Sequence, residues 1–169
     1  VALAEGTELE VPVMLAAFGP LRRGEICALT MDDIDGNVIH VCKDMVLDSN
    51  REWVVKPPKT FSSDRYVTMP DRIIKLIEKQ GYVTNYDPNG LSYAFSTLLK
   101  NNGIEHFRFH DLRHFCCSYL HGMNVPDVYI MQRSGHSTNS TLRNVYTHTL
   151  QDQNAEETKR ILKQFSAII

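Results

Sequence analysis

Thirteen residues toward the end of this chain read His136-Ser137-Thr138-Asn139-Ser140-Thr141-Leu142-Arg143-Asn144-Val145-Tyr146-Thr147-His148. The stretch places Tyr146 ten positions after His136, which itself follows Gly135. Glycine readily adopts the left-handed conformation at which many helices end. The stretch therefore predicts a turn between two helices at Gly135 and His136, with Tyr146 at the end of the second helix.

Two further clusters contain side chains that could act together with this tyrosine. One reads His110-Asp111-Leu112-Arg113-His114, and the other reads Leu21-Arg22-Arg23-Gly24-Glu25. Guanidinium groups match phosphate geometry and stay charged at neutral pH. Lysine or histidine can protonate a leaving oxygen, and tyrosine can form a covalent bond to phosphorus. Two arginines, two histidines and a tyrosine are the parts needed to attack a phosphodiester without a metal.

The composition is that of an ordinary globular chain, and its 169 residues fit one domain. The net charge of −2 and the pI near 6.4 argue against a free-standing nucleic-acid binder, which is usually basic. Local clustering matters more than the sum, and much of the positive charge lies near the motifs. These basic residues are Arg22, Arg23, Lys59, Arg65, Arg108, Arg113 and Arg133.

The cysteines and the apolar runs indicate a cytoplasmic protein. None of the four cysteines forms a CxxC pair, so we expect reduced and mostly buried thiols without a disulfide framework. The apolar run from Val11 to Phe18 is too short to span a bilayer, and no signal peptide is evident. We therefore expect no membrane partner.

The periodicity predicts a mainly α fold with a small three-stranded antiparallel sheet (α+β). We predict helices over 8–18, from Pro20 in a first turn to about Thr30, and then near 71–80, 90–101, 110–121, 126–133, 138–146 and 153–166. The sheet would consist of strands over 38–42, 52–56 and 65–69. The last helix is amphipathic, and the simplest interpretation packs its apolar side on the core of the same chain.

His110 and Arg113 lie three residues apart and so share a face near the start of a predicted helix, where the helix dipole favours a bound phosphate. His110 and His114 lie four residues apart and could alternatively bind zinc. Asp111 stands where an HExxH motif has glutamate, and no third ligand is evident. Zinc is therefore the weaker interpretation.

Each remaining candidate also has an ordinary structural interpretation. Arg22 could form a surface salt bridge with Glu25, and Lys59 could be a solvated lysine in a hairpin turn. We expect His136 to be exposed at its turn and able to donate, although it could instead cap a helix or tie buried polar groups. Tyr146 could be a half-buried aromatic side chain. The order and spacing of the set favour a catalytic site over these separate roles.

The chain resembles the catalytic domain of tyrosine recombinases, the phage integrase family, over nearly its whole length. It is most similar to integrases of prophages and conjugative transposons. The matching motifs are Leu21-Arg22-Arg23-Gly24-Glu25, Pro58-Lys59-Thr60, His110-Asp111-Leu112-Arg113, Gly135-His136 and Val145-Tyr146. Two residues depart from the family's pattern, Pro20 in place of a glycine and Ser134 in place of a leucine. We expect the polar Ser134 to loosen the turn at His136.

The resemblance implies a reaction in which Arg22, Arg113 and His136 bind the scissile phosphate. Tyr146 would attack it to form a 3′-phosphotyrosine. The Lys59 ammonium would protonate the leaving 5′ oxygen, with His110 assisting proton transfer. A 5′-hydroxyl of a partner duplex would then attack the phosphotyrosine, so the resemblance implies no metal, ATP or other cofactor.

The resemblance also implies partners. Members of the family work as tetramers on two double-stranded DNA attachment sites, with excisionase or DNA-bending proteins as further partners. In such tetramers the C-terminal helix often docks on a neighbouring protomer, a second interpretation of the predicted helix at 153–166. The family's core-binding and arm-binding domains precede the catalytic domain. We expect residues 1–169 to be a single catalytic domain without those two, cut from a longer protein.

Two rival functions remain open from the sequence. A type IB topoisomerase-like enzyme would use the same phosphotyrosine chemistry to relax supercoils. A non-catalytic DNA-binding regulator would have kept the fold but lost the reaction. The complete set of six candidate residues argues against the second rival.

Overall fold

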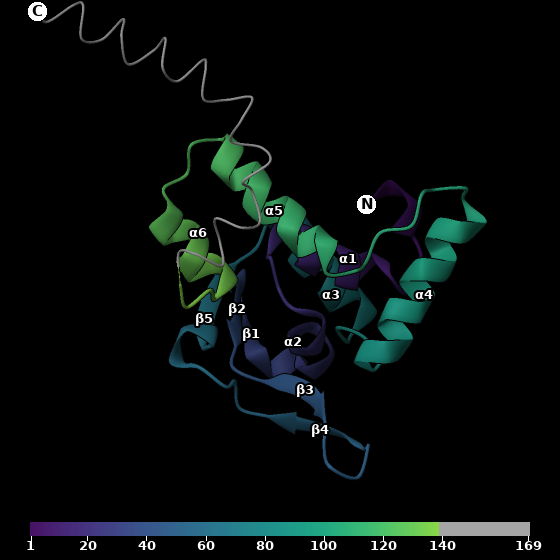
Figure 1. Cartoon of the computed structure of the whole chain (residues 1–169), viewed down its shortest axis with the longest axis horizontal. Helices are drawn as coiled ribbons and strands as arrows, with labels where there is room; N and C mark the ends of the chain where they lie inside the picture. The colour runs from purple at the N-terminus through teal and green to yellow at the C-terminus, as the bar shows by residue number, and fades with distance from the viewer. Residues whose placement is uncertain (139–169) are drawn as a thin grey trace, which may run out of the picture.

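The computed structural model describes residues 1–138, in which helices surround a central helix and two small sheets flank it (Figure 1). The helices are α1 (Glu10–Phe18), α2 (Arg23–Ala28), α3 (Asp71–Gln80), α4 (Pro88–Asn101), α5 (Asp111–Gly122) and α6 (Asp127–Ser134), with 3-10 turns at Ala2–Ala4, Met31–Asp33 and Phe61–Ser63. The strands are β1 (Ile34–Asp35), β2 (Val38–Val41), β3 (Asp44–Leu47), β4 (Trp53–Lys56) and β5 (Arg65–Thr68). Tyr146 and the two helices predicted at the end of the chain lie outside the described residues.

The mainly α fold with a small antiparallel sheet is confirmed, but the membership of that sheet differs from the prediction. Its strand order is β1-β2-β5, with β2 pairing antiparallel to both neighbours. The predicted strand over 52–56 instead pairs with β3 in a separate two-stranded hairpin. No strand was predicted at β3, so β4 was assigned to the wrong sheet.

The helix at the first arginine motif begins later than predicted. Pro20 lies outside α2, whose N-cap is Arg22 in an extended conformation. Pro20 therefore does not form a first helical turn, and its carbonyl accepts a hydrogen bond from Arg113 instead. This contact fastens α5 to the segment between α1 and α2.

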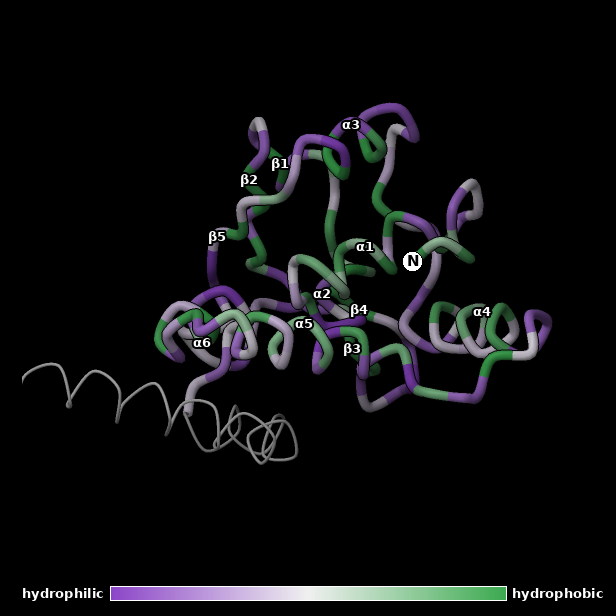
Figure 2. Tube along the Cα trace, turned by 90° about the horizontal axis from the view of Figure 1, so that it is seen from above, coloured by the Kyte–Doolittle hydropathy of each residue, from purple (hydrophilic) through white to green (hydrophobic). Residues whose placement is uncertain are grey.

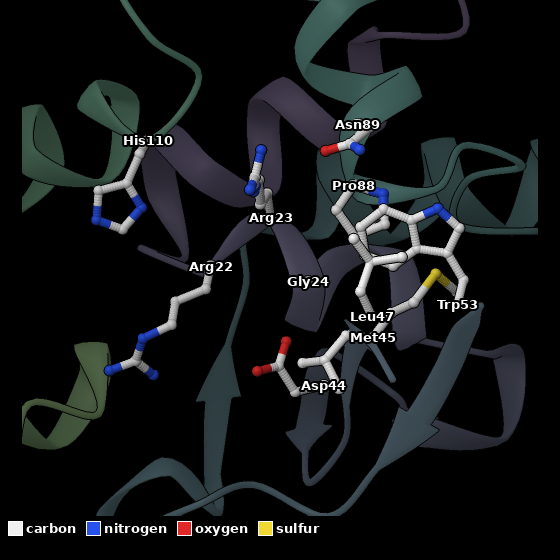
Figure 3. Close-up of a pocket in the computed structure, with 11 residues that line it drawn as sticks. Arg22, Arg23, Gly24, Asp44, Met45, Leu47, Trp53, Pro88, Asn89 and His110 are labelled. Atoms are coloured by element: carbon white, nitrogen blue, oxygen red, sulfur yellow. The ribbon is translucent and has the colours of Figure 1, made fainter. Parts of the chain in front are cut away.

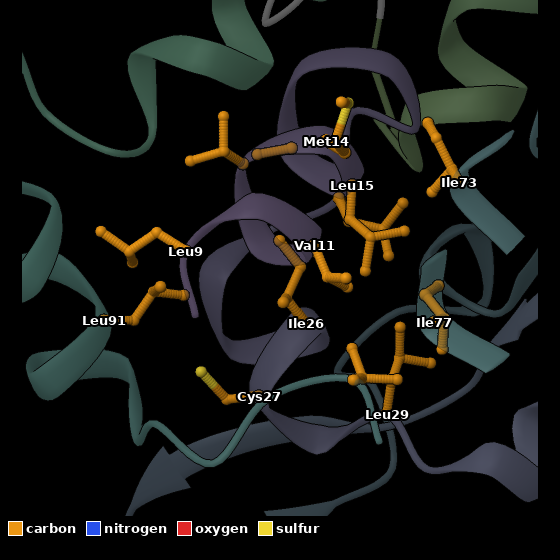
Figure 4. Packing of buried hydrophobic residues seen from close by; sticks show 14 of the residues in the cluster. Leu9, Val11, Met14, Leu15, Ile26, Cys27, Leu29, Ile73, Ile77 and Leu91 are labelled. Atoms are coloured by element: carbon orange, nitrogen blue, oxygen red, sulfur yellow. The ribbon is translucent and has the colours of Figure 1, made fainter. Parts of the chain in front are cut away.

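Helix α1 forms the centre of the hydrophobic core. All residues from Glu10 to Ala17 are buried, and α1 contacts α2, α3 and α5. Figure 4 shows its Val11 beside Ile26 of α2, and Figure 2 shows the mostly hydrophobic α1 inside the trace and α3 with alternating character. Each fully buried aliphatic side chain contributes roughly 1.5–3 kcal/mol. The core thus fixes the start of α2, where Arg22 lies.

The four cysteines are free thiols, as predicted, and three of them are buried. Burial raises the pKa of Cys27 and of Cys116 to about 12, so these thiols stay protonated at neutral pH. Within residues 1–138, none of the helices is long and apolar enough to cross a bilayer.

Candidate active site

Arg22 projects from the start of α2 into a groove. Its Nη1 donates to Glu25 Oε1 at 2.7 Å and to Ser63 Oγ at 3.4 Å. Its Nη2 donates to the carbonyl of Gly135 at 2.9 Å, which joins α2 to the turn after α6. A guanidinium has five N–H donors, so these three bonds within residues 1–138 leave two for an anion. The side chain is 32% exposed, which gives such an anion access.

Glu25 is a buried carboxylate shared by two arginines. Besides Arg22, it accepts bonds from Nη1 and Nη2 of Arg65, both at 2.9 Å. Arg65 also donates to the carbonyls of Ser63 and Arg133. Burial alone would raise the pKa of Glu25, but the hydrogen bonds and charges of Arg65 and Arg22 outweigh it and hold that pKa below its usual value. Glu25 therefore stays ionised, and the Arg22–Glu25 pair is a buried anchor and not a surface salt bridge.

Arg113 is the buried arginine of the site, with only 1% of its surface exposed. Its Nη1 donates to the carbonyl of Pro20 and its Nη2 to His136 Nε2 at 3.1 Å, whereas its buried Nε has no partner within residues 1–138. Burial, together with the charge of Arg22, lowers the pKa of Arg113 to about 10, so the side chain remains charged at pH 7. A buried cation with unused donors is costly unless an anion complements it.

His136 is buried, with 9% of its surface exposed, so the prediction of an exposed donor is wrong. The turn brings His136 against Arg113, whose guanidinium can only donate, so Nε2 is an acceptor. Burial first, and then the charges of Arg113 and Arg22, lower the pKa of His136 to about 3. The imidazole is therefore neutral at pH 7.

The expectation that Ser134 loosens this turn is also wrong. Ser134 is fully buried, and its hydroxyl lies 2.6 Å from the carbonyl of Ile130 and 2.7 Å from His136 Nδ1. A polar side chain is tolerated in a buried position when its hydrogen bonds are satisfied. Ser134 thus holds the turn in place.

His110 is the N-cap residue of α5 and lines the groove with Arg22. Burial, followed by the charges of His114, Arg113 and Arg22, lowers the pKa of His110 to about 4. His110 is therefore neutral at pH 7 and can accept a proton. Its ring packs edge-on against that of His114, with ring centroids 4.6 Å apart. Across residues 1–138, no group of three or more His, Cys, Asp or Glu side chains is placed to hold a metal ion.

The groove has two adjoining parts that share Arg22 and Asp44. One part, of about 380 Å³, is lined also by Trp53 and His110 (Figure 3). The other, of about 220 Å³, is lined also by Lys59, which lies on the exposed loop between β4 and β5. Lys59 and His110 therefore reach the groove from different elements, with Arg22 common to both parts.

Three of the six predicted site residues line this groove: Arg22, Lys59 and His110. Arg113 and His136 are buried and bond to each other, and the neighbouring Gly135 accepts a bond from Arg22. The sixth residue, Tyr146, lies outside the described residues. Motif spacing did not indicate that Glu25 pairs with Arg65, that Asp44 lines the groove or that Ser134 bonds His136. Only Glu25 gave a usable signal, because a glutamate three residues after an N-cap can complete a capping box.

Gly135 is required at the end of α6 for two reasons. Its φ of +70° is left-handed, and a Cβ there would lie 2.9 Å from Arg65 Nη1 and 3.1 Å from the carbonyl oxygen of Ser62. We expect Gly135→Ala to destabilise the fold by about 2–4 kcal/mol, because backbone strain of about 1–2 kcal/mol adds to overpacking. Urea unfolding measures the loss.

Gly36→Ala is the matched control, because Gly36 also has a positive φ, of +54°, but a Cβ there would meet nothing within 4 Å. Its loss should be limited to backbone strain of about 1–2 kcal/mol. Equal losses in the two variants would show that Arg65 does not constrain position 135.

A protein-family model described as the phage integrase family matches residues 4–153. The chain belongs to the phage integrase family. This membership confirms the resemblance that the sequence motifs indicated.

Curated relatives include recombinases and transposition proteins. The tyrosine recombinase XerC-like protein of Caldanaerobacter subterraneus subsp. tengcongensis is 27% identical over 186 residues, which cover 86% of this chain and 48% of that protein. The transposase of transposon Tn916 from Enterococcus faecalis is 28% identical over 177 residues, covering 85% of this chain and 43% of that protein. This phage integrase family chain thus spans about half the length of the curated relatives it matches.

Solved structures share the fold. The Tn1549 transposon integrase in complex with transposon right end DNA superposes with a TM-score of 0.74 at 21% identity, covering 95% of this chain and 62% of that one. XerA recombinase superposes with a TM-score of 0.70 at 20% identity, covering 92% of this chain and 60% of that one. A lambda integrase tetramer bound to a Holliday junction superposes with a TM-score of 0.59 at 19% identity, covering 86% of this chain and 44% of that one.

Proposed function

We propose that this chain cleaves and rejoins DNA strands through a 3′-phosphotyrosine at Tyr146, as the catalytic part of a site-specific recombinase of a mobile element. The observation that carries the proposal is the buried Arg113, whose Nε has no partner within residues 1–138 and whose pKa is lowered by the charge of Arg22, the arginine that lines the solvent-accessible groove. Such an arrangement suits an anion, and a phosphodiester is the anion that a member of this family would bring there. The proposal places the chain in the cytoplasm, on the nucleoid when it is bound to DNA.

Arg22 and Arg113 would supply the positive charge that the transition state needs. Negative charge grows on the non-bridging oxygens as phosphorus becomes five-coordinate, and fixed donors stabilise it without reorganisation. Both side chains are already held, Arg22 by Glu25 and Gly135, and Arg113 by Pro20 and His136. His136 would join them once the phosphate draws the Arg113 donor away from Nε2 and that nitrogen takes up a proton.

The proton transfers balance with residues of this chain. Tyr146 Oη forms a bond to phosphorus, and its proton passes to the neutral His110. The bond between phosphorus and the 5′ oxygen breaks, and the Lys59 ammonium gives that oxygen a proton. General acid–base catalysis of this kind contributes about 10²–10⁴-fold to rate.

Rejoining would reverse these roles on a second duplex. A 5′-hydroxyl from the partner strand attacks phosphorus, and the phosphotyrosine bond breaks. Among the structural neighbours, one integrase is bound to transposon DNA and another is a tetramer on a Holliday junction. We propose double-stranded attachment sites and further protomers as partners, with excisionase or DNA-bending proteins as accessory factors. In such a tetramer, the predicted C-terminal helix would be exchanged in trans.

A covalent-trapping assay tests the proposal. Nicked duplexes drawn from DNA flanking the encoding gene are incubated with the chain in EDTA at low salt and resolved on denaturing gels. A labelled protein–DNA adduct that forms under these conditions supports phosphotyrosine chemistry. Binding of the same duplex without an adduct would favour a non-catalytic DNA-binding protein. Relaxation of supercoiled plasmids regardless of sequence would favour a topoisomerase-like activity.

Asp44 offers a separate prediction about phosphate binding. Burial and the charge of Glu25 raise the pKa of Asp44, whereas the cations of Arg22 and Lys59 lower it. Its carboxylate lines both parts of the groove, so it repels an arriving phosphate. We expect Asp44→Asn to bind DNA roughly two- to fivefold more tightly in a fluorescence titration at low salt, the effect of removing one nearby like charge.

Asp35→Asn provides the control, because Asp35 is an exposed carboxylate at the end of β1 and does not line the groove. It should bind DNA as the unmodified chain does. An equal gain in both variants would mean that net charge alone, and not the position of Asp44, sets the affinity.

A further inference from the structure

The end of α6 contains a chain of buried hydrogen bonds that the proposed reaction does not by itself require. Ser134 Oγ lies 2.6 Å from the Ile130 carbonyl and 2.7 Å from His136 Nδ1. His136 Nε2 lies 3.1 Å from Nη2 of Arg113. Ser134 and Arg113 are almost fully buried, so bulk water does not substitute for these partners.

The groups at the two ends of this series of hydrogen bonds, the Ile130 carbonyl and the Arg113 guanidinium, determine which atom donates in each bond. The Ile130 carbonyl can only accept, so the Ser134 hydroxyl donates to it and uses its single proton. Ser134 must then accept from His136 Nδ1, which therefore carries a proton. The Arg113 guanidinium can only donate, so Nε2 must carry a lone pair. The two ends independently require the same neutral tautomer of His136, protonated on Nδ1.

We propose that Ser134 is a positioning residue that fixes His136 as the Nδ1–H tautomer, leaving Nε2 as its only nitrogen that can exchange a proton with the reaction centre. The inference rests on the proposed function, because it assigns Nε2 a place beside the phosphate held by Arg113. With Ser134 present, Nε2 can be protonated and then donate to a phosphate oxygen without any rearrangement at Nδ1. An alanine at position 134 would remove this fixed acceptor.

Within residues 1–138, the surroundings of His136 supply no other anchor of this kind. The charged and titratable groups that act on it are Arg113 and His114 of α5, Arg22 at the start of α2 and Arg65 of β5. The cations among them favour a neutral ring but do not choose between its nitrogens, whereas the Arg113 bond fixes the ring only while Arg113 stays in place. When a phosphate engages Arg113, Ser134 is the contact that keeps Nε2 directed at the site.

Two measurements test the proposal. The first is ¹⁵N NMR of the histidine side chains, with and without bound duplex DNA and at a pH where the ring is neutral, which distinguishes the two tautomers. The His136 signal is assigned by its loss in His136→Asn. The second is the rate of adduct formation with nicked DNA as a function of pH. Both are made on the unmodified chain, on Ser134→Ala, on Ser134→Thr as the hydroxyl-retaining variant, and on Ser118→Ala, a serine of α5, as a control.

We expect the unmodified chain, Ser134→Thr and Ser118→Ala to show the Nδ1–H tautomer. Once bound DNA engages Arg113, Ser134→Ala should show mixed tautomers. It should also cleave about tenfold more slowly, the effect of losing one buried hydrogen bond. The pH profile of Ser134→Ala should also move, because the basicity of Nε2 changes when Nδ1 loses its acceptor.

Several outcomes would overturn the inference. An Nε2–H tautomer in the unmodified chain would contradict the bond directions. An unchanged tautomer in DNA-bound Ser134→Ala would show that another group fixes the ring. A changed tautomer with unchanged cleavage would remove Ser134 from the reaction. A chain with the expected tautomers that forms no adduct would instead overturn the proposed function and, with it, any part that Ser134 has in cleavage.

Discussion

A Tyr146→Phe chain is expected to form no covalent adduct with nicked DNA while binding the same duplex with unchanged affinity. The substitution removes one oxygen, the proposed nucleophile, and leaves the phosphate donors Arg22 and Arg113 in place. Deleting the nucleophile of a covalent mechanism costs about 10⁶-fold in rate. The adduct should therefore fall below detection on a denaturing gel, and a parallel fluorescence titration should show unimpaired binding.

Tyr129→Phe is the matched control for this prediction. Tyr129 is an exposed tyrosine on α6, so loss of its hydroxyl should leave both adduct formation and binding unchanged. An adduct that persists in Tyr146→Phe would assign the nucleophile to another residue. An adduct that is lost in both variants would point to a general defect of the chain, and the role of Tyr146 would lack support.

Helices were the most predictable part of the fold. The segment 71–80 was predicted as the structure has it, and α4, α5 and α6 begin or end within two residues of their predicted limits. Apolar residues that recur every three or four positions report directly on which helix face is buried. Pro20 was misplaced because a proline suits a first helical turn in general, whereas here the N-cap is Arg22.

Strand pairing was less predictable, because a short strand does not encode its partner. The predicted strand over 52–56 corresponds to β4, but the strand that precedes it and pairs with it is β3 and not β2. In β3, three residues are half-buried and Leu47 is exposed, so the alternation that marks a strand is absent. The hairpin of β3 and β4 therefore could not be predicted from alternating hydrophobicity.

In the candidate site, too, local sequence identified residues but not their long-range contacts. Motif spacing selected Arg22, His110, Arg113 and His136. The structure places Arg22 and His110 on one groove and joins the buried Arg113 and His136 by a hydrogen bond. Motif spacing did not show that His136 is buried, because its burial depends on Arg113, which lies 23 positions away in sequence. Nor does spacing reveal the partners of Arg65, which span α2, the 3-10 turn before β5 and α6.

The second large effect is expected at Glu25, where alanine should destabilise the fold by about 3–5 kcal/mol. This is the usual loss when one partner of a buried ion pair is removed and the other charge is left uncompensated. Arg65 would be that charge, since its side chain is only 3% exposed and both its terminal nitrogens donate to Glu25. Urea unfolding at pH 7 measures the loss directly.

Glu5→Ala is the control, because Glu5 pairs with Arg72 at the surface, where both side chains are mostly exposed. Exposed pairs contribute about 0–1 kcal/mol, so this variant should unfold close to the unmodified chain. A similarly small loss in Glu25→Ala would mean that Arg65 finds other partners and that Glu25 does not anchor the site.

The pH dependence of stability separates the charge of Glu25 from its shape. The pKa of Glu25 is lower in the folded chain than its usual value, so its contribution is present above the unfolded-state pKa of about 4.3 and is lost as pH falls through the folded-state pKa. Glu25→Gln keeps the shape but cannot ionise. We therefore expect the difference in unfolding free energy between the unmodified chain and Glu25→Gln to be largest at neutral pH and to shrink below pH 4. A difference that stays constant with pH would mean that packing at position 25, and not its charge, holds Arg22 and Arg65 in place.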